Sequence, residues 1–477
     1  MSLQKPKSGL IRTPIEIKHW EDLEPKRKAN LKIGIWEGVF AQTHIVLVCG
    51  KFLTGFALRL GANAFHFGLL NALPFLMQPA NIISSYLSNK IGHRKPIVLA
   101  GVFLARFIWF AVIPLVFLKP VFGERVILIF LFFYAIMAFG GAITGSAWTM
   151  WMDNLVPLKL RGRYFGLRSA ILSVLTIIVD YIASQTRDSF ARAGHEDIFY
   201  AVLFSIAVLA AGIDLYFLNK QWEPPWKPAP SPHFIRLMKE FFQNKNFFTL
   251  TRAFLLWNLG LGISSAFFSV HMLTYLQMSF VKIWIYTLIV LTTGLLFNFI
   301  WGHLMDKAGT RAVLLSNAFI ISIIPLFWLI PTQRDLTFIY IDAFFTGLCW
   351  TGFNLASFNI PLVLAPQKNR PFFVSTFLSI SGLAFGFGSI LGGVIAYQLR
   401  FFNVIIWGHI FINYHILFLL SAILRSIGAL QFSYIRDVES KGVIYLFQMM
   451  GSGLQKSFFI VRDFIFAPKN ELPVIKR

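Results

Sequence analysis

Long apolar segments alternate with short polar ones along most of the chain. A helix that crosses a membrane needs about 20 mostly apolar residues, and twelve segments approach or exceed that length. They fall at roughly 33–59, 64–89, 96–118, 125–152, 164–186 and 197–219, and then at 249–276, 282–305, 311–331, 335–364, 370–398 and 404–434. The pattern predicts an all-α integral membrane protein with twelve transmembrane helices.

A polar, proline-rich stretch divides the twelve segments into two sets of six. We expect a tail over 1–32, a first six-helix bundle over 33–219, a linker over 220–248, a second bundle over 249–436 and a tail over 437–477. Within the linker, apolar residues between Phe234 and Phe242 recur at helical spacing, which predicts a short helix at the membrane surface. The C-terminal tail mixes apolar and basic residues, and it fits either an amphipathic helix or a disordered segment.

The composition supports lipid as the main solvent of this chain. Of its 477 residues, 56% are hydrophobic and 13% are charged, whereas an average soluble domain has roughly 25% charged residues. The formal net charge is +22, and a strongly basic chain can bind nucleic acid. Here the Lys and Arg residues lie mainly between the apolar segments, so we expect membrane lipid head groups as their partners and no nucleic acid.

The basic residues also indicate the orientation of the chain. Connections after the second, fourth, sixth, eighth and tenth segments are rich in Lys and Arg, whereas the opposite connections hold fewer bases or bases accompanied by acids. Because Lys and Arg accumulate on the cytoplasmic side, we expect the linker and both termini in the cytoplasm of a cell (inner) membrane protein. The first thirty residues lack the apolar core of a cleavable signal peptide, so the first segment should remain as an anchor.

Two motifs recur in the two halves at nearly the same spacing. Ser85-Tyr-Leu-Ser-Asn89-Lys90-Ile-Gly92-His-Arg94 follows the second segment, and Gly302-His-Leu-Met-Asp306-Lys307-Ala-Gly309-Thr-Arg311 follows the eighth. Leu155-Val-Pro157-Leu-Lys-Leu-Arg161 follows the fourth segment, and Leu364-Ala-Pro366-Gln-Lys-Asn-Arg370 follows the tenth. Two independent matches indicate an internal duplication. Because an even number of crossings separates them, the two bundles are related by an axis along the membrane normal.

The positions that the two copies of the first motif share have physical explanations. Asn89 or Asp306 at a helix end can accept hydrogen bonds from the N-terminal amides of a neighbouring helix. Gly92 and Gly309 permit a tight turn with positive φ. The basic residues of the motif hold the turn at the cytoplasmic face, and they are Lys90, Arg94, Lys307 and Arg311.

This motif resembles the loop signature of the major facilitator superfamily, which occurs between helices 2 and 3 and again between helices 8 and 9. The resemblance covers about residues 33–436 and implies two pseudo-symmetric six-helix bundles, a central cavity and rocker-switch transport. In that family the acid of the motif takes part in a cytoplasmic latch that favours the outward-open state, a role that fits Asp306. Asn89 lacks the charge, which implies a weaker latch in the first half. The stretch from Asp153 to Gly166 is similar to that of uncharacterised bacterial members and indicates no substrate.

Ionisable residues of the first apolar segment are candidates for the transport chemistry. A charged side chain in the bilayer costs roughly 2.5–3.5 kcal/mol on insertion scales, so such residues usually face a cavity or a partner. Glu37, His44 and Lys51 are seven residues apart, which places them on one face of a continuous helix. We expect a polar stripe along the solute path, with His44 or Glu37 able to carry a proton. In the alternative, Glu37 is interfacial and only His44 and Lys51 are deep.

Other polar residues fall in segments that the resemblance places around the cavity or at its periphery. Asp180 could recognise a coupling ion or a cation, whereas Asp342 is expected at the interface. Arg106 is expected to form a structural ion pair with Glu37, Asp180 or Asp214, and Arg425 to form one in the second half. The remaining candidates for the solute path are polar residues of cavity helices: Gln78, Asn258, His271, Asn298 and Asn354.

Glycines four residues apart predict close packing of the fourth and eleventh helices. The pairs are Gly141 with Gly145, Gly382 with Gly386, and Gly388 with Gly392.

The sequence shows no motif of an enzyme, a metal site or a cofactor site. The stretch Gly451-Ser-Gly-Leu-Gln-Lys456-Ser457 has Gln455 where a phosphate loop has glycine, and no strand precedes it. Cys49 and Cys349 lie in apolar segments and are expected to be buried thiols. We therefore expect a monomeric carrier of a small solute, a symporter or antiporter without a cofactor, with protons as the candidate coupling ion. A membrane-embedded enzyme and a channel-like facilitator remain the alternatives.

Overall fold

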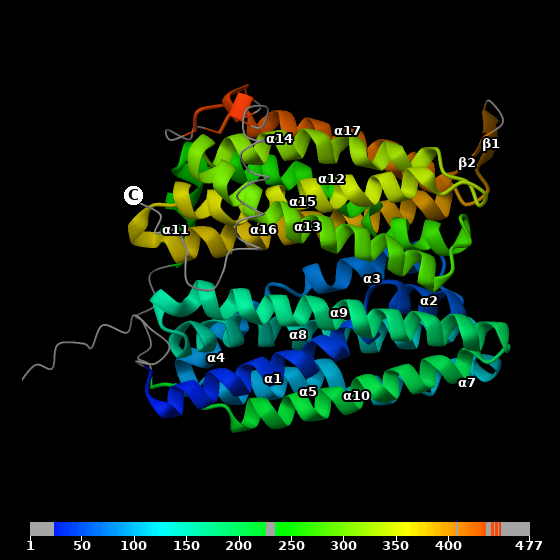
Figure 1. The fold of residues 1–477 in the computed structure, drawn as a ribbon, viewed down its shortest axis with the longest axis horizontal. Coiled ribbons are helices and arrows are strands. Elements are labelled where there is room, and N and C mark those ends of the chain that lie inside the picture. The colour runs from blue at the N-terminus through cyan, green and yellow to red at the C-terminus, as the bar shows by residue number, and fades with distance from the viewer. Residues whose placement is uncertain are drawn as a thin grey trace, which may run out of the picture.

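The structure is a computed structural model that describes residues 23–225, 234–406, 409–435, 440–442, 444–446 and 448–449. Long helices form two bundles that lie one above the other in Figure 1. Eleven helices of the described residues are long and apolar enough to cross a membrane, and an interrupted helix adds a twelfth crossing. The predicted all-α fold of a multi-pass membrane protein is therefore confirmed.

The first half contains six crossings, three of which are interrupted helices. The first crossing consists of α1 and α2, the second of α3 and α4, and the third of α5, α6 and α7. Their bounds are α1 (Pro25–Val48), α2 (Gly50–Leu60), α3 (Ala64–Leu76), α4 (Ala80–Ile91), α5 (Lys95–Phe107), α6 (Trp109–Val112) and α7 (Leu115–Phe122). The last three crossings are α8 (Arg125–Leu155), α9 (Arg161–Arg192) and α10 (Glu196–Lys220). The first helix thus begins at Pro25, earlier than the boundary at residue 33 that the sequence predicted.

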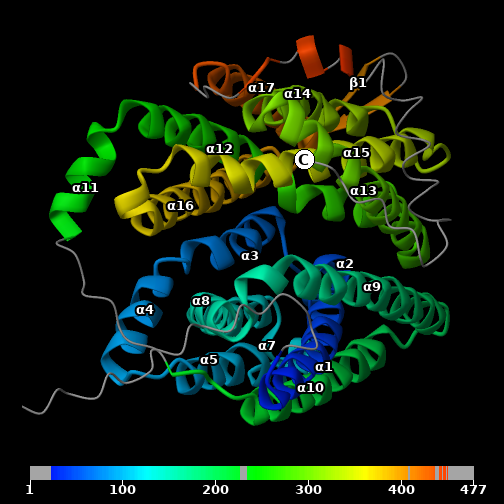
Figure 2. The same ribbon diagram turned by 60° about the vertical axis from the view of Figure 1, so that its left-hand side comes forward.

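The second half follows the linker helix α11 (Phe234–Gln243). Its crossings are α12 (Lys245–Thr274), α13 (Phe280–Ala308), α14 (Thr310–Ile323) with a 3₁₀ extension, α15 (Thr337–Leu364), α16 (Arg370–Gln398) and α17 (Asn413–Phe432). The predicted helix α11 lies beside α12 at one end of the bundle (Figure 2). Its Phe241 ring is buried against Phe247 and Phe373, so this face packs on the second half and not on lipid alone.

The twelfth apolar segment does not begin as a helix, contrary to the prediction. The strands β1 (Asn403–Ile406) and β2 (His409–Ile412) pair antiparallel ahead of α17, with Asn403 opposite Ile412. Val404, Ile405 and Ile410 are β-branched, and such residues favour an extended backbone. We call the end of the bundles that carries this pair of strands the ribbon end, and the end that carries α11 the linker end (Figure 1).

The first two crossings were predicted as continuous helices, and both are broken. Cys49 is extended between α1 and α2, and Gly50 has a φ of 58°, a conformation that favours glycine. The second crossing is interrupted between Leu76 and Ala80, where Pro79 has no N–H to continue the helical hydrogen bonds. The second break lies at the middle of its crossing, whereas the first leaves 24 residues in α1 and 11 in α2.

The internal repeat is visible in the backbone, as the sequence motifs predicted. Gly92 ends α4 with a φ of 75°, and Gly309 ends α13 with a φ of 91°. Pro157 has φ −56° and ψ 141° before the 3₁₀ turn Leu158–Leu160. Pro366 has φ −55° and ψ 132° before the equivalent turn Gln367–Asn369. The proline turns therefore fold alike in the two halves. The two glycines share a positive φ but differ in ψ, which is 3° at Gly92 and 155° at Gly309.

Glycines let helices of the second half approach closely and join it to the first half. A Cβ at Gly388 would lie 2.4 Å from the Leu259 oxygen, and one at Gly392 would lie 2.2 Å from the Ile263 oxygen. The predicted close packing of α16 is therefore confirmed. It is wrong for α8, because a Cβ at Gly141 or Gly145 would meet nothing within 4 Å.

Gly262→Ala and Gly141→Ala are expected to change stability in opposite directions. A Cβ at Gly262 would lie 2.2 Å from the Phe385 oxygen and 2.8 Å from the Ser389 nitrogen, so two backbones must separate at a cost of roughly 1–3 kcal/mol. Alanine at position 141 meets open space and favours the helix by up to about 1 kcal/mol. Thermal unfolding in one detergent measures both variants, and a Gly262→Ala protein as stable as the parent would contradict this packing.

Candidate functional site

A cavity of about 420 Å³ lies inside the first half. Residues of α1, α5, α8 and α9 form most of its wall, and Pro74 and Leu218 contribute from α3 and α10. The wall is largely apolar or aromatic, with Val48, Trp109 and Trp148 among its residues. Its polar side chains are Glu37, Gln42, His44, Arg106, Tyr134, Thr144 and Arg168. We call this space the first-half cavity.

An ion pair between α1 and α9 lies at the wall of this cavity. Arg168 Nη2 is 2.9 Å from Glu37 Oε2, and Arg168 Nε donates to the Gly34 oxygen at 3.2 Å. A Cβ at Gly38 would lie 2.6 Å from the guanidinium, so glycine makes room for the arginine. Glu37 is buried, and it is therefore not an interfacial residue.

Sequence reasoning did not select Arg168, because this residue closely follows the basic residues Arg161 and Arg163. The turn ends where α9 begins, at Arg161. Seven residues further, about 10 Å along a helix, Arg168 is already inside the bundle. Its distance from the start of the helix is the one signal that could have separated it from the loop residues.

His44 lies two turns after Glu37 in α1 and lines the same cavity. Its Nδ1 lies 2.9 Å from the Ala207 oxygen. A carbonyl oxygen only accepts, so Nδ1 carries the proton and Nε2 is left as a hydrogen-bond acceptor in the neutral ring. His44 can therefore accept a proton or a donor group of a ligand at the cavity wall.

A second ion pair joins α5 to α10 beside the cavity. Arg106 Nη1 contacts Asp214 Oδ2, and Asp214 is fully buried. Of the three acids that the sequence offered as partners, Asp214 is the one in contact. Arg106 also lines the first-half cavity, whereas Asp214 does not.

Lys51 lies apart from Glu37 and His44, although the spacing predicted one stripe. Its Nζ is 2.8 Å from Asp180 Oδ1 and donates to the Phe280 oxygen of the second half at 3.3 Å. The break at Cys49 and Gly50 explains the difference, because α2 does not continue the helical phase of α1. The predicted stripe is thus divided between two places.

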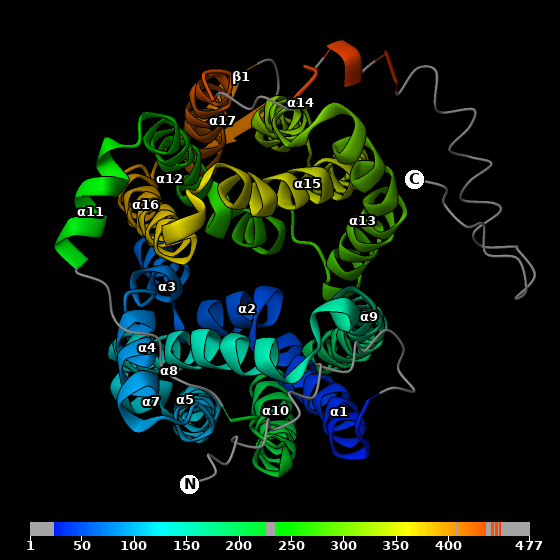
Figure 3. The ribbon, with the colours of Figure 1, turned by 90° about the vertical axis from the view of Figure 1, so that its left-hand side faces the viewer.

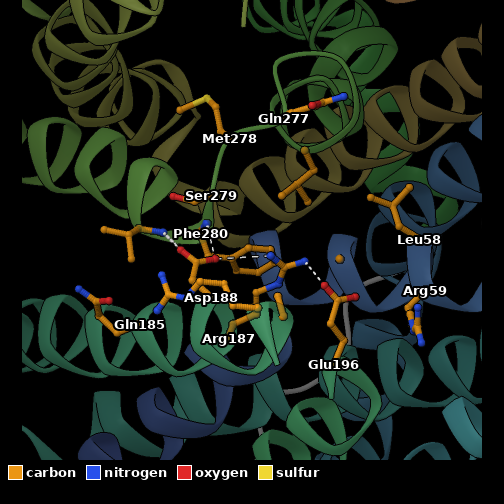
Figure 4. A pocket seen from close by; sticks show the side chains of 15 residues that line it. Leu58, Arg59, Gln185, Arg187, Asp188, Glu196, Gln277, Met278, Ser279 and Phe280 are labelled. Carbon is orange, nitrogen blue, oxygen red and sulfur yellow. Dashed lines mark hydrogen bonds and ion pairs between the residues drawn. The ribbon is translucent and has the colours of Figure 1, made fainter. Parts of the chain in front are cut away.

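The two halves are joined at the ribbon end around Phe280, the first residue of α13 (Figure 4). Asp188 accepts hydrogen bonds from the backbone N–H groups of Phe280 and Val281, both at 3.1 Å. A carboxylate at a helix N-terminus also opposes the helix dipole favourably. The Arg187 guanidinium lies 4.3 Å from the Phe280 ring centroid and pairs with Glu196 at 2.9 Å.

The contacts around Phe280 form one unit, which we call the ribbon-end junction; it comprises Lys51, Asp180, Arg187, Asp188 and Phe280. A Cβ at Gly55 would lie 2.8 Å from the Phe280 ring, so the ring fits against a helix without a side chain there. A vestibule of about 810 Å³ lies beside the junction, with Arg59, Gln185 and Gln277 in its wall (Figure 4).

The described residues place other contacts between the halves from the ribbon end to the middle of the bundles. Asn71 Nδ2 donates to Ser265 Oγ at 2.6 Å and to Ser389 Oγ at 2.8 Å. The Trp284 indole N–H donates to the Ile177 oxygen at 3.0 Å. Seen along the bundles, α3 lies beside α16 and α9 beside α13 (Figure 3). The ribbon end is therefore the closed end.

Solved structures that resemble this fold are transporters. The nucleoside transporter NupG matches with a TM-score of 0.60 and 12% identity over 86% of this chain and 99% of that chain. A D-xylose-proton symporter matches with 0.63 and 15% over 87% and 98%. An inward-facing, unoccupied bacterial homolog of the human lysosomal transporter Spinster matches with 0.57 and 14% over 88% and 100%. The chain has the major facilitator fold. No family profile and no curated protein matches its sequence.

At the linker end of this major facilitator fold, the motif bases bind the ends of later helices. Arg94 Nη1 donates to the Met150 oxygen at 2.8 Å. Lys95, which follows the motif, donates through Nζ to the oxygen of Asn219 in the last turn of α10 and to that of Gln221 just after it. In the second half, Arg311 Nη2 donates to the Ser433 oxygen after α17. The C-terminal carbonyls of a helix carry partial negative charge, so these bases stabilise both bundles.

The acid that binds helix amides in the first half comes from the linker, not from the motif. Glu223 accepts hydrogen bonds from the backbone N–H groups of Arg94 at 2.7 Å and Lys95 at 3.2 Å. Asp306 is exposed and forms no hydrogen bond or ion pair with any residue that the structure describes. Asn89 lies in α4, and its side chain is outside the described part. The proposed latch is therefore not formed at Asp306 in this structure.

The remaining candidates for the solute path do not gather at one site. Gln78 lies against Gly382 between the halves, and Asn258 donates to the Phe254 oxygen of its own helix. Asn298 and Asn354 are exposed. His271 is fully buried, and its Nε2 lies 3.2 Å from Nε2 of His415 inside the second half.

Two further predictions differ from the structure, and a third stays a prediction. Asp342, expected at the interface, lies in the second turn of α15, where it is fully buried and accepts from the Tyr286 hydroxyl at 2.8 Å. Arg425 donates to Ser264 Oγ at 2.9 Å and has no ion pair among the described residues. Cys49 is exposed because the helix break brings it to the cavity wall, whereas Cys349 is buried as predicted.

Proposed function

We propose that this protein is a secondary active transporter that moves a small solute by alternating access, coupled to protons. The observation that carries the proposal is the buried Glu37–Arg168 ion pair at the wall of the first-half cavity. A buried ion pair costs desolvation energy, so a chain usually retains one in a membrane helix for a function.

The distribution of basic residues supports an orientation with the linker end in the cytoplasm. Lys and Arg outnumber the acids there, although Arg161 pairs with Asp153. Several ribbon-end bases pair with acids, as Arg59 does with Asp197 at 2.5 Å. By the positive-inside rule, the ribbon end, where the two halves are joined, then faces the outside. Both termini would be cytoplasmic in a cell membrane protein.

Alternating access requires a second state in which the ribbon-end junction is open. We propose that the linker end then closes, with Asp306 accepting hydrogen bonds from the N-terminal amides of a neighbouring helix. Lys51 would keep Asp180 as its partner but lose the Phe280 oxygen of the opposite half. Asp306 is exposed in the present state, and it has no bond to any described residue that would have to break before it takes this role.

Glu37 is the proton site that this geometry supports best. The groups that interact with it electrostatically come from three other helices: Arg168 and Tyr164 of α9, Arg106 of α5 and Asp214 of α10. A proton on Glu37 neutralises the partner of Arg168, and the guanidinium can then bind another group. A solute and a proton can in this way be carried together.

Purified protein in liposomes tests the proposal. With a pH-sensitive dye inside, we expect saturable, solute-dependent proton movement for at least one member of a panel of sugars, nucleosides, amino acids, dipeptides and monocarboxylates. Glu37→Gln should abolish accumulation driven by a proton gradient but retain solute exchange, because the proton site alone is lost. The same panel without any protein-dependent proton movement would refute proton coupling. Unsaturated flux would favour a channel, and chemical conversion of a solute would favour an enzyme.

A further inference from the structure

The first-half cavity points to the chemical class of the solute. We propose that it binds an organic monoanion: one carboxylate on a compact apolar or aromatic body. The inference names a substrate class for the proposed carrier. That this anion is transported, and not only bound, rests on the proposed function. Its physical basis lies in the surplus of hydrogen-bond donors at the cavity wall.

The donor surplus comes from two guanidinium groups. A guanidinium carries five N–H donors. Among the described residues, Arg168 uses Nε for the Gly34 oxygen and Nη2 for Glu37, and Arg106 uses Nη1 for Asp214. Each guanidinium has further N–H groups, both arginines line the cavity, and Glu37, already engaged, is the one carboxylate among the lining residues. A ligand with acceptor oxygens satisfies these donors, and a carboxylate matches the planar fork of a guanidinium.

A cation fits this wall poorly. An ammonium group would face two guanidiniums, and its one charged partner would be Glu37, which it would have to separate from Arg168. Removing one partner of a buried pair leaves an uncompensated charge. When Glu37 is protonated, the Glu37–Arg168 pair at the cavity wall has a net positive charge, which again favours an anionic ligand.

The size and the apolar walls restrict the rest of the ligand. A volume of about 420 Å³ lies at the lower end of the range of small-molecule sites. Val48, Trp109, Met137 and Trp148 also line the cavity, and a sugar hydroxyl group placed against these side chains would lose its water without a partner. An aromatic or branched aliphatic body fits these walls better.

Glu37 and the ligand carboxylate compete for Arg168 under this proposal. Ionised Glu37 holds Nη2 at 2.9 Å, and a neutral side chain at this position frees the guanidinium. Glu37→Gln is therefore expected to tighten anion binding near neutral pH. A purely structural ion pair predicts the opposite result, since its loss would loosen the cavity.

Binding to the purified full-length protein in detergent tests the inference without transport. The probes are 3-phenylpropanoate, its amide 3-phenylpropanamide and the amine 3-phenylpropylamine, which share one body. Cys49 is exposed at the cavity wall, so protection of this thiol from N-ethylmaleimide measures occupancy. We expect the carboxylate to bind at least about tenfold more tightly than the amide, because charged hydrogen bonds are the stronger ones. The amine should not protect.

Three variants sharpen the test. Arg168→Gln should weaken carboxylate binding by about tenfold or more, and Glu37→Gln should strengthen it several-fold. Arg161→Gln is the matched control, because it removes a guanidinium that pairs with Asp153 outside the cavity. It should bind the carboxylate like the parent protein.

Several results would overturn the inference: equal protection by carboxylate and amide, preferential protection by the amine, no protection by any probe, or weaker carboxylate binding in Glu37→Gln. Failure of the transport proposal looks different. Carboxylate binding without proton-coupled movement in liposomes would refute the carrier and leave the anion site. Proton-coupled movement of a neutral solute without carboxylate binding would refute the anion site and leave the carrier.

Discussion

Asp214→Ala is expected to lower the free energy of unfolding by about 3–5 kcal/mol, because it leaves the Arg106 guanidinium without its buried partner. Asp214 is fully buried between α10 and α5, and the Arg106 side chain is 14% exposed. Water can therefore replace the lost carboxylate only in part. Thermal unfolding of the purified protein in detergent measures the effect as a large decrease in Tm.

Two comparisons isolate the pair itself. Asp153→Ala removes an acid that pairs with Arg161 where the two side chains are 55% and 32% exposed, so it should cost less than about 1 kcal/mol. The double variant Asp214→Leu with Arg106→Met removes both charges and should recover most of the loss, as apolar replacement of a whole buried pair often does. A Tm of Asp214→Ala equal to that of the Asp153→Ala control would show that the pair is not a structural element.

Asp188→Ala is expected to open the ribbon end. The substitution removes two hydrogen bonds from a carboxylate to the first turn of α13, each worth roughly 1.5–3 kcal/mol. A loss of about 3 kcal/mol changes the equilibrium between two conformations on the order of 100-fold. Spin labels at Ala193 and Arg334, which are exposed in different halves at this end, should report longer distances.

The matched control for this measurement is Asp197→Ala. Asp197 is also an acid at the ribbon end, but its partner Arg59 belongs to the same half, so the distance between the halves should not change. Both proteins need Cys49 and Cys349 replaced before labelling. If Asp188→Ala retains the parent distance distribution, the ribbon-end junction does not hold the halves together.

The architecture could be predicted because its causes are local. A helix in lipid must satisfy its own backbone, so each long apolar segment between basic turns had one structural solution. The turns at Gly92 and Gly309 and the 3₁₀ turns after Pro157 and Pro366 were predictable for the same reason. Their backbone angles depend on a few adjacent residues.

The candidate site could be predicted only in part, because its partners come from distant segments. Glu37 and His44 could be selected because an ionisable side chain in an apolar segment is costly in the bilayer, and it therefore usually faces a cavity or a partner. Arg168 was not, since nothing in the sequence near the start of α9 shows that it faces Glu37, 131 positions away. Glu223 was hidden in the same way, as a linker acid that binds the amides of a helix 129 positions earlier.

The break in the first crossing shows why the spacing of polar residues did not predict where Lys51 lies. The spacing of Glu37, His44 and Lys51 does place three side chains on one face of a straight helix. Cys49 and Gly50 end that helix before Lys51. A glycine inside an apolar segment is common, and its φ of 58° depends on the tertiary structure.

The same break divides the first crossing into two rigid helical segments joined by a hinge. Its lower piece, α1, holds the Glu37 carboxylate and the His44 ring, and its upper piece, α2, holds Lys51 against the opposite half. The two pieces meet at Gly50, which has no side chain to resist rotation. A movement of α1 on ligand binding therefore reaches the ribbon-end junction through this one backbone joint. The flexibility of the backbone at Gly50 then determines how strongly ligand binding in the first-half cavity is coupled to opening of the junction.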